Sequence, residues 1–421
     1  MTRHLLTAGL VPGRSLALAA GLVAALALAQ ALAPLPAASQ DQALPPISAA
    51  THSTFDKLTA DPGVVRALAF LRADDERTLK EQIELTEIPA PPFKEARRAA
   101  DYLERFKALG LADARIDAEG NVLARRKGSG GGPTLVVSAH LDTVFPEGTD
   151  VKVKVTDKRY AAPGIGDDSR GLAVILSVIR GLNEAKLTTV GDIVFMGTVG
   201  EEELGDLRGV KAFFREHRDI DGFISVDGID INRIVNAATG SRRYRILYTG
   251  PGGHSFQAFG LPSATHALGR AIAKIGEVRP PAQPKTTFTV GTLKGGTSVN
   301  AIAADAELGL DMRSNDAGEL AKLETRILQL ARDAADEENR RWGKTDEKEM
   351  IKVEFKLVGD RPAGAGAIDS PMLDVARRAV AAVGGDVKAV AGASTDSNQA
   401  ISLGIPALTL GGGGEGGGAH G

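Results

Sequence analysis

Residues 134–142 read TLVVSAHLD, an unbroken apolar run that ends in a histidine and an aspartate. Similar runs follow in DIVFMGTVG (192–200) and GFISVD (222–227), and helical stretches such as GLAVILSVIRGLNEA (171–185) lie between them. Continuous apolar strands that alternate with helices are typical of a buried parallel sheet with helices on both faces. The sequence therefore predicts an α/β fold with a mostly parallel sheet flanked by helices.

Residue types that bind metal ions follow these apolar runs, at strand ends or in the loops beside them. They are His140, Asp142, Asp167, Asp168, Glu201, Glu202, Asp227 and His420. In an open parallel sheet, ligands bind outside the carboxyl ends of the strands. His140 and Asp142 are two residues apart at a strand end, where alternate side chains share a face, so both can address one pocket. Two imidazoles and several carboxylates at one sheet edge are what a two-metal hydrolytic centre needs.

The pattern changes near Arg243, where RRYRILYTG (242–250) alternates apolar and polar residues. Further strands (TTFTVGTLKGG, AELGLDMRS and MIKVEFKLV) and two helices, one of them from about 317 to 342, follow. We expect an inserted α+β domain at 242–360, with two helices on one face of a four-stranded antiparallel sheet. The catalytic domain is then split into residues 39–241 and 361–421.

The first 38 residues have the composition of a secretory leader. Arg3 and Arg14 precede an Ala- and Leu-rich run from Leu16 to Ala33, and the small residues at 29 and 31 and at 37–39 offer two cleavage sites. A retained N-terminal anchor is the alternative, because the run approaches the ~17 residues that can span a membrane. We expect an exported protein, periplasmic or secreted, with no membrane contact after leader removal.

Composition limits the partners and the metal ligands. The 421-residue chain has a formal net charge of -3, which gives no electrostatic reason to expect nucleic acid, so a small molecule is the expected partner. The chain contains no cysteine. Any transition metal must then be held by histidine and carboxylate groups.

Several motifs in this chain resemble a known family. SAHLDTVFP (138–146), GIGDDSRG (164–171), TVGEEELGDLRG (198–209), GPGGHS (250–255) and GGGAH (416–420) are similar to motifs of the di-zinc exopeptidases that include peptidase T, carboxypeptidase G, aminoacylase and carnosinase. The resemblance runs from about Thr78 to the end of the chain. It implies a zinc exopeptidase-like catalytic domain that holds two Zn²⁺ per subunit, with Mn²⁺ or Co²⁺ as alternatives.

The resemblance also implies a role for each motif residue. His140 and Asp227 would bind one metal, Asp167 would bridge both, and Glu202 and His420 would bind the other. Asp142 would orient His140, and Glu201 would be the general base. A cis peptide bond between Asp167 and Asp168 is also implied.

In the inserted domain, the resemblance points to substrate binding and dimerisation. His254 would bind the oxyanion of the tetrahedral intermediate, often in the partner subunit of a homodimer, and Asn300 and Arg313 would hold substrate. Ala303 stands where family members often carry proline.

The second part of the catalytic domain holds three further candidates. Thr395, Asp396 and Asn398 are candidates for contact with a substrate amine.

The predicted reaction is hydrolysis of an amide bond in short peptides. Asp at position 227 resembles the tripeptidase and dipeptidase branches, which favours an aminopeptidase. A carboxypeptidase or an N-acyl amino acid amidohydrolase of the same family is the alternative. A non-catalytic peptide-binding protein is the second alternative, because the chain stops one residue after His420 and a terminal ligand without support can fray.

Overall fold

The computed structural model describes residues 44–419. Two compact units emerge: unit 1 comprises Met1–Ala238 and Ala365–Gly421, and unit 2 comprises Thr239–Gly364. The predicted leader and His420 lie outside the described residues. No helix within residues 44–419 is both long and apolar enough to cross a membrane.

A mostly parallel sheet forms the centre of unit 1, which confirms the predicted fold class. Its parallel strands are β6 (Ile193–Thr198), β3 (Leu135–His140), β7 (Gly222–Val226) and β17 (Ala407–Leu410), paired in that order. On one side β2 (Val122–Arg126) and β1 (Arg115–Ile116) add antiparallel strands. On the other side β8 (Ile234–Ala238) pairs antiparallel with β17 and parallel with β16 (Val390–Ala393).

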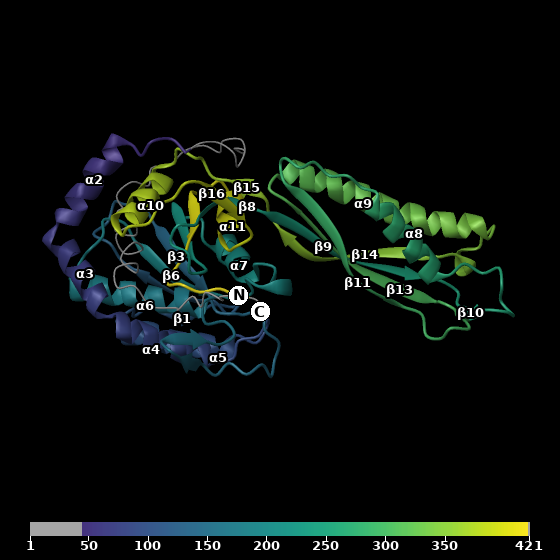
Figure 1. The fold of residues 1–421 in the computed structure, drawn as a ribbon, viewed down its shortest axis with the longest axis horizontal. Helices are drawn as coiled ribbons and strands as arrows, with labels where there is room; N and C mark the ends of the chain where they lie inside the picture. The colour runs from purple at the N-terminus through teal and green to yellow at the C-terminus, as the bar shows by residue number, and fades with distance from the viewer. Residues whose placement is uncertain (1–43, 420–421) are drawn as a thin grey trace, which may run out of the picture. The chain divides into compact units, whose positions relative to one another are not determined.

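Helices cover both faces of this sheet (Figure 1). Val137 and Phe195 belong to one core together with α6, whereas Val136 and Val194 belong to a second core together with Phe213 of α7. Successive strand residues point to opposite faces, so every residue of β3, β6 and β7 is buried. This two-sided burial is the physical reason for the unbroken apolar runs.

The helices of unit 1 are α2 (Ala49–Ala60), α3 (Pro62–Ala73), α4 (Asp75–Thr86), α5 (Ala96–Ala108), α6 (Ser169–Glu184), α7 (Arg208–Glu216), α10 (Pro371–Ala382) and α11 (Ser397–Ser402). A small hairpin of β4 (Lys154–Thr156) and β5 (Arg159–Ala161) precedes α6, and the 3-10 turn η1 (Glu203–Gly205) precedes α7. Both segments border the loops that carry the predicted site residues.

Unit 2 is built on an antiparallel sheet of order β11-β13-β9-β14. The strands are β9 (Gly240–Thr249), β11 (Thr286–Gly295), β13 (Asp305–Ser314) and β14 (Lys352–Arg361). Side chains of β13 alternate between buried and partly exposed, so one face carries the core with α8 (Ala264–Gly276) and α9 (Ala317–Arg341). The separate antiparallel sheet predicted for the insert is confirmed.

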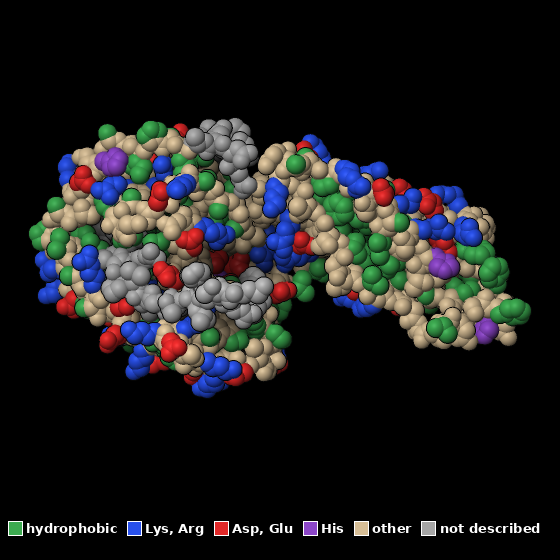
Figure 2. Space-filling model, in the orientation of Figure 1, with side chains coloured by type: hydrophobic (Ala, Val, Ile, Leu, Met, Phe, Trp, Pro, Cys, Tyr) green, Lys and Arg blue, Asp and Glu red, His purple; other side chains and the backbone are tan. Residues whose placement is uncertain are grey.

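Short elements complete unit 2. The strand β10 (Gly253–His254) pairs with β12 (Ala301–Ile302), and η2 spans Glu347–Glu349. At the end of the insert, β15 (Gly364–Ala365) joins the central sheet of unit 1 beside β8. On the face drawn in Figure 2, basic and acidic side chains are intermixed over both units.

Candidate metal centre

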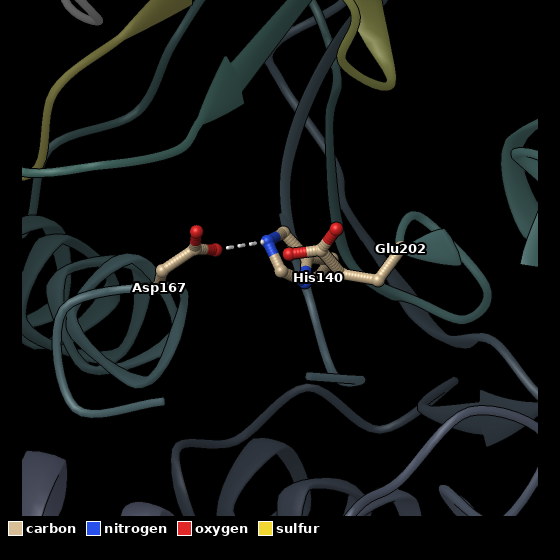
Figure 3. A group of neighbouring side chains, drawn as sticks. All are labelled: His140, Asp167 and Glu202. Atoms are coloured by element: carbon tan, nitrogen blue, oxygen red, sulfur yellow. Dashed lines mark hydrogen bonds and ion pairs between the residues drawn. The ribbon is translucent and has the colours of Figure 1, made fainter. Parts of the chain in front are cut away.

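Three of the predicted site residues lie together in unit 1. His140 ends β3, Asp167 lies in the loop before α6, and Glu202 lies in the loop after β6. Each offers one ligand atom, and these atoms all lie within 4.8 Å of one another. Figure 3 shows the Glu202 carboxylate beside the imidazole and a hydrogen bond from His140 to Asp167. The carboxyl ends of adjacent parallel strands thus meet at one site, as the sequence predicts.

The contacts of His140 identify which ring nitrogen faces the cluster. Nδ1 lies 3.0 Å from the main-chain oxygen of Asp142, and Nε2 lies 2.8 Å from Oδ1 of Asp167. A carbonyl oxygen only accepts hydrogen bonds, so Nδ1 carries a proton and Nε2 points at the carboxylates. Burial opposes protonation of His140, but the hydrogen bond to Asp167 and the nearby carboxylates, Asp168 foremost, raise its pKa well above the usual value.

Asp142 connects the end of β3 to the loop that carries Glu201 and Glu202. Its Oδ1 accepts a hydrogen bond from the backbone N–H of Glu201 at 3.1 Å, and its Oδ2 accepts one from Glu202 at 2.8 Å. The carboxylate lies 3.7 Å from Nδ1 of His140. The hydrogen bond that fixes the tautomer of His140 therefore goes to the backbone of Asp142. The side chain of Asp142 positions the backbone of Glu201 and Glu202.

Asp168 holds the backbone on the other side of the cluster. Its carboxylate accepts hydrogen bonds from the N–H of His140 at 3.0 Å and from Gly171 at 3.1 Å, so it also caps α6. Complete burial raises the pKa of Asp168 well above the usual value, although the charge of His140 opposes the shift. The peptide bond between Asp167 and Asp168 is cis, as predicted.

Arg98 supports the site and was missed in the sequence. Its guanidinium, fully buried in α5, donates to the main-chain oxygen of Leu141 at 2.8 Å and to that of Ile88. Burial lowers the pKa of Arg98 to about 10, opposed by the charges of Asp142 and Asp168, so the side chain stays positive at neutral pH. The signal for this role was its position on the helix face that also buries Tyr102.

Three further candidates lie in the loop before α11 and in its first turn. The side chains of Thr395, Asp396 and Asn398 are buried, as is that of His140, and their contact with a substrate amine stays a prediction. Asp396 accepts a hydrogen bond from the hydroxyl of Thr198 at 2.5 Å. Burial raises the pKa of Asp396 to about 7, and the hydrogen bond from Thr198 and the charge of His140 oppose the shift. The charges of His140, Asp142 and Asp227 all act on Asp396, so its carboxyl group lies close to the site.

The remaining predicted residues of unit 1 are placed as follows. Asp227 follows β7 and donates its backbone N–H to Leu410, but it is not one of the three residues of the cluster. Glu201 is 5% exposed, next to Glu202. His420, the fifth predicted ligand, lies outside the described residues.

The predicted substrate-binding residues lie in unit 2. His254 is exposed in β10, and its Nδ1 accepts hydrogen bonds from the N–H groups of Phe256 and Gln257. Asn300 is exposed and accepts a hydrogen bond from the hydroxyl of Ser298. Arg313 donates through Nε to Asp311 at 2.8 Å.

The donor set of the cluster fits a divalent transition metal. One imidazole nitrogen and two carboxylate groups suit Zn²⁺, and they also suit Mn²⁺ and Co²⁺. Nε2 of His140 and Oδ1 of Asp167 share a proton in a 2.8 Å hydrogen bond. Metal binding requires that such a proton be released, and the same two atoms then become ligands.

Comparison with known proteins identifies the family. The profile of peptidase family M20/M25/M40 matches residues 136–421. The chain belongs to this family, and membership implies a metal-dependent hydrolase.

Individual relatives agree with this assignment. Over 354 residues, 80% of this chain and 90% of the relative, the sequence is 26% identical to the uncharacterized protein YqjE of Bacillus subtilis (strain 168). The structure of aminopeptidase PepT from Bacillus cereus ATCC 10987 is 26% identical, with a TM-score of 0.64 over 80% of this chain and 90% of that one. Carboxypeptidase G2 of Pseudomonas sp. (strain RS-16) is 34% identical over 114 residues, 25% of this chain and 27% of that protein.

Proposed function

We propose that this protein is an exopeptidase that removes the amino-terminal residue from short peptides. The grouping of His140, Asp167 and Glu202 within 4.8 Å carries the proposal, in a chain that belongs to a peptidase family. Two Zn²⁺ ions are proposed as cofactors, with Asp227 and His420 as the remaining ligands. Mn²⁺ and Co²⁺ are the alternatives.

The chain's own residues divide the work of hydrolysis. Two bound metal ions supply a water of lowered pKa and a polarised scissile carbonyl. Glu201 takes a proton from the attacking water and gives it to the leaving amine. Asp142 holds the backbone of Glu201 and Glu202 through two hydrogen bonds, so the proton acceptor and the ligand keep a constant separation.

In unit 2, His254 is proposed to donate a hydrogen bond to the oxyanion, and Asn300 and Arg313 to hold the substrate. Arg313 uses Nε for Asp311, and its two terminal nitrogens form no hydrogen bond within residues 44–419. They are the part of a guanidinium that pairs with a carboxylate through two hydrogen bonds. This supports recognition of a carboxylate or a peptide carbonyl by Arg313.

An aminopeptidase is favoured over the other activities of the family by two observations. Position 227 is an aspartate, and the chain resembles an aminopeptidase structure over 80% of its length. The 34% identity to carboxypeptidase G2 is higher but covers 25% of this chain. A carboxypeptidase or an N-acyl amino acid amidohydrolase is therefore the second candidate.

The test compares trialanine with N-acetyl-trialanine as substrates of the metal-loaded protein. An aminopeptidase needs the free amine, so trialanine is expected to be cleaved faster and to release alanine and dialanine. Faster cleavage of the acetylated peptide would contradict the proposal and favour the second candidate.

The role of Glu201 has a matched control in its neighbour Glu203, which is exposed. E201Q is expected to lose about 10²- to 10⁴-fold in kcat, the usual contribution of a general base, with unchanged metal content. E203Q is expected to stay near wild type. Equal activity of E201Q and wild type would remove the catalytic assignment, and metal binding without any turnover in wild type would favour the non-catalytic alternative.

We also propose that the protein is exported and that it forms a homodimer through residues 242–360. Export is supported by the leader-like composition of the first 38 residues, and the dimer is supported by resemblance to the family. N-terminal sequencing of protein from the periplasm and light scattering of the purified protein test the two proposals separately. An uncleaved cytoplasmic protein would contradict the first, and a monomer would contradict the second.

A further inference from the structure

A cavity of about 600 Å³ lies in unit 1 beside the cluster of candidate metal ligands. Its wall includes Asp167 itself, the hairpin of β4 and β5, Gly228 and Ile229 after β7, and the segment 413–419. A space of this volume lies in the range of small-molecule pockets. Because Asp167 belongs to both the wall and the cluster, a substrate held at the cluster can extend into this cavity.

Two cationic side chains of the hairpin line this cavity. Lys154 lies opposite Ala161, and Thr156 lies opposite Arg159, so Lys154 and Arg159 sit at diagonal positions on one face of the hairpin. Both line the cavity and are exposed. Neither side chain forms an ion pair or a hydrogen bond with any residue in 44–419. Like charges placed this close repel each other, and a bound anion would offset that repulsion.

The other charged groups of the cavity are already engaged. Asp167 is hydrogen-bonded to His140, and Glu415 has an interaction partner of its own. Arg170 is buried and donates to the main-chain oxygens of Gly412 and Gly413. Lys154 and Arg159 are therefore the charges that remain available to a ligand.

We infer that this cavity binds a carboxylate of the substrate and that Lys154 and Arg159 recognise it. The inference rests on the proposed function, because it assigns a preferred substrate class, short peptides with a carboxylate that reaches this cavity, to the same metal site. The carboxylate has two sources in a short peptide, an acidic side chain or the free carboxyl terminus. Both present the same group to the two cations.

The test uses the double variant K154Q/R159Q in the full chain. K158Q is the matched control, because Lys158 lies in the turn of the same hairpin, is exposed, and does not line the cavity. Substrates are Ala-Glu-Ala against Ala-Gln-Ala, Ala-Ala-Glu against Ala-Ala-Gln, and trialanine against its C-terminal amide. The first two pairs report a side-chain carboxylate, and the third reports the terminal carboxylate.

Wild type and K158Q are expected to prefer the acid member of at least one pair by about fivefold in kcat/KM, the range for two exposed charge contacts. K154Q/R159Q is expected to lose that preference while cleaving trialanine amide, which carries no carboxylate, at an unchanged rate. Added salt should reduce the preference in wild type, since exposed charges are screened. No preference in wild type, or a preference that survives in K154Q/R159Q, would overturn the inference.

Failure of the proposed function is distinguishable from failure of this inference. If wild type cleaves no peptide, equilibrium binding of the same pairs is measured by calorimetry with wild type, K154Q/R159Q and K158Q. Tighter binding of the acid member that only K154Q/R159Q loses supports the carboxylate site without turnover. Equal binding of both members by wild type overturns it.

Discussion

Replacing Asp142 with asparagine tests how the site is held together. Each oxygen of the Asp142 carboxylate accepts one backbone N–H, from Glu201 at 3.1 Å and from Glu202 at 2.8 Å. An asparagine of the same shape has one oxygen and one NH₂ group, so one of the two N–H groups would face a donor. D142N therefore removes at least one hydrogen bond to a charged acceptor in a fully buried site.

The size of the effect follows from that lost bond. A hydrogen bond to a charged group contributes about 1.5–3 kcal/mol, which corresponds to roughly 10- to 150-fold in an equilibrium or rate constant. Because the bonded backbone carries both the proposed base and a proposed ligand, the loss is expected in kcat/KM and in metal affinity. A reduction of about 10- to 100-fold in either is typical of residues that orient metal ligands.

The assay combines steady-state peptide hydrolysis with metal titration, and D61N is the matched control. Asp61 also accepts two backbone N–H groups, from Gly63 at 2.8 Å and Val64 at 3.1 Å, but both bonds go to the same oxygen, Oδ1. Asparagine keeps that oxygen and is an equally good helix N-cap. D61N should behave as wild type, and a D142N protein within threefold of wild type in both assays would refute the reasoning.

Three further predictions concern stability. The pKa of Asp396 is raised to about 7, so its contribution to stability is present below about pH 4 and is lost as pH rises towards 7. Over this range the unfolding free energy of metal-free D396N should rise relative to that of wild type, by at most about 4 kcal/mol. A difference between the two proteins that does not change with pH in urea melts would contradict this. Arg180 bonds Asp74 and Glu81 in a buried network, so R180M should cost about 3–5 kcal/mol in the same melts. Arg77 is exposed and pairs with the other oxygen of Glu81, so R77M should cost about 1 kcal/mol or less. Equal costs of R180M and R77M would argue against the network. Chelation should abolish peptide hydrolysis and lower the midpoint of thermal unfolding, since a metal ion at 100 times its Kd stabilises the folded protein by about 2.7 kcal/mol. An unchanged calorimetric midpoint together with full activity after chelation would exclude a bound metal.

The central sheet was predictable because its strands are buried on both faces. The runs that became β3, β6 and β7 have no polar face, and the residues that follow them meet at one edge of the sheet. The same rule anticipated that His140, Asp167 and Glu202 would lie together. The alternation of apolar and polar residues in RRYRILYTG (242–250), most of which belongs to β9, likewise predicted an antiparallel sheet in the insert.

The supporting contacts were not predictable from residue type and spacing. Arg98 is a charged residue in a helix, and only tertiary packing shows that its donors meet carbonyl oxygens of the site backbone. The two N–H groups held by Asp142 come from residues 59 and 60 positions away. Asp396 is a candidate for contact with a substrate amine, and the loop sequence carries no sign that its carboxylate accepts a hydrogen bond from Thr198, a residue 198 positions away. Such contacts depend on the packed structure rather than on local pattern.

Anomalous X-ray diffraction from crystals grown with zinc tests the central claim most directly. The account predicts a peak bonded to Nε2 of His140 and to the carboxylates of Asp167 and Glu202, at about 2.0–2.2 Å from each ligand atom, with the 2.8 Å contact between His140 and Asp167 opened to admit the ion. A second peak on the other side of Asp167 would complete the proposed pair. Zinc bound elsewhere, with the hydrogen bond between His140 and Asp167 intact, would contradict the account.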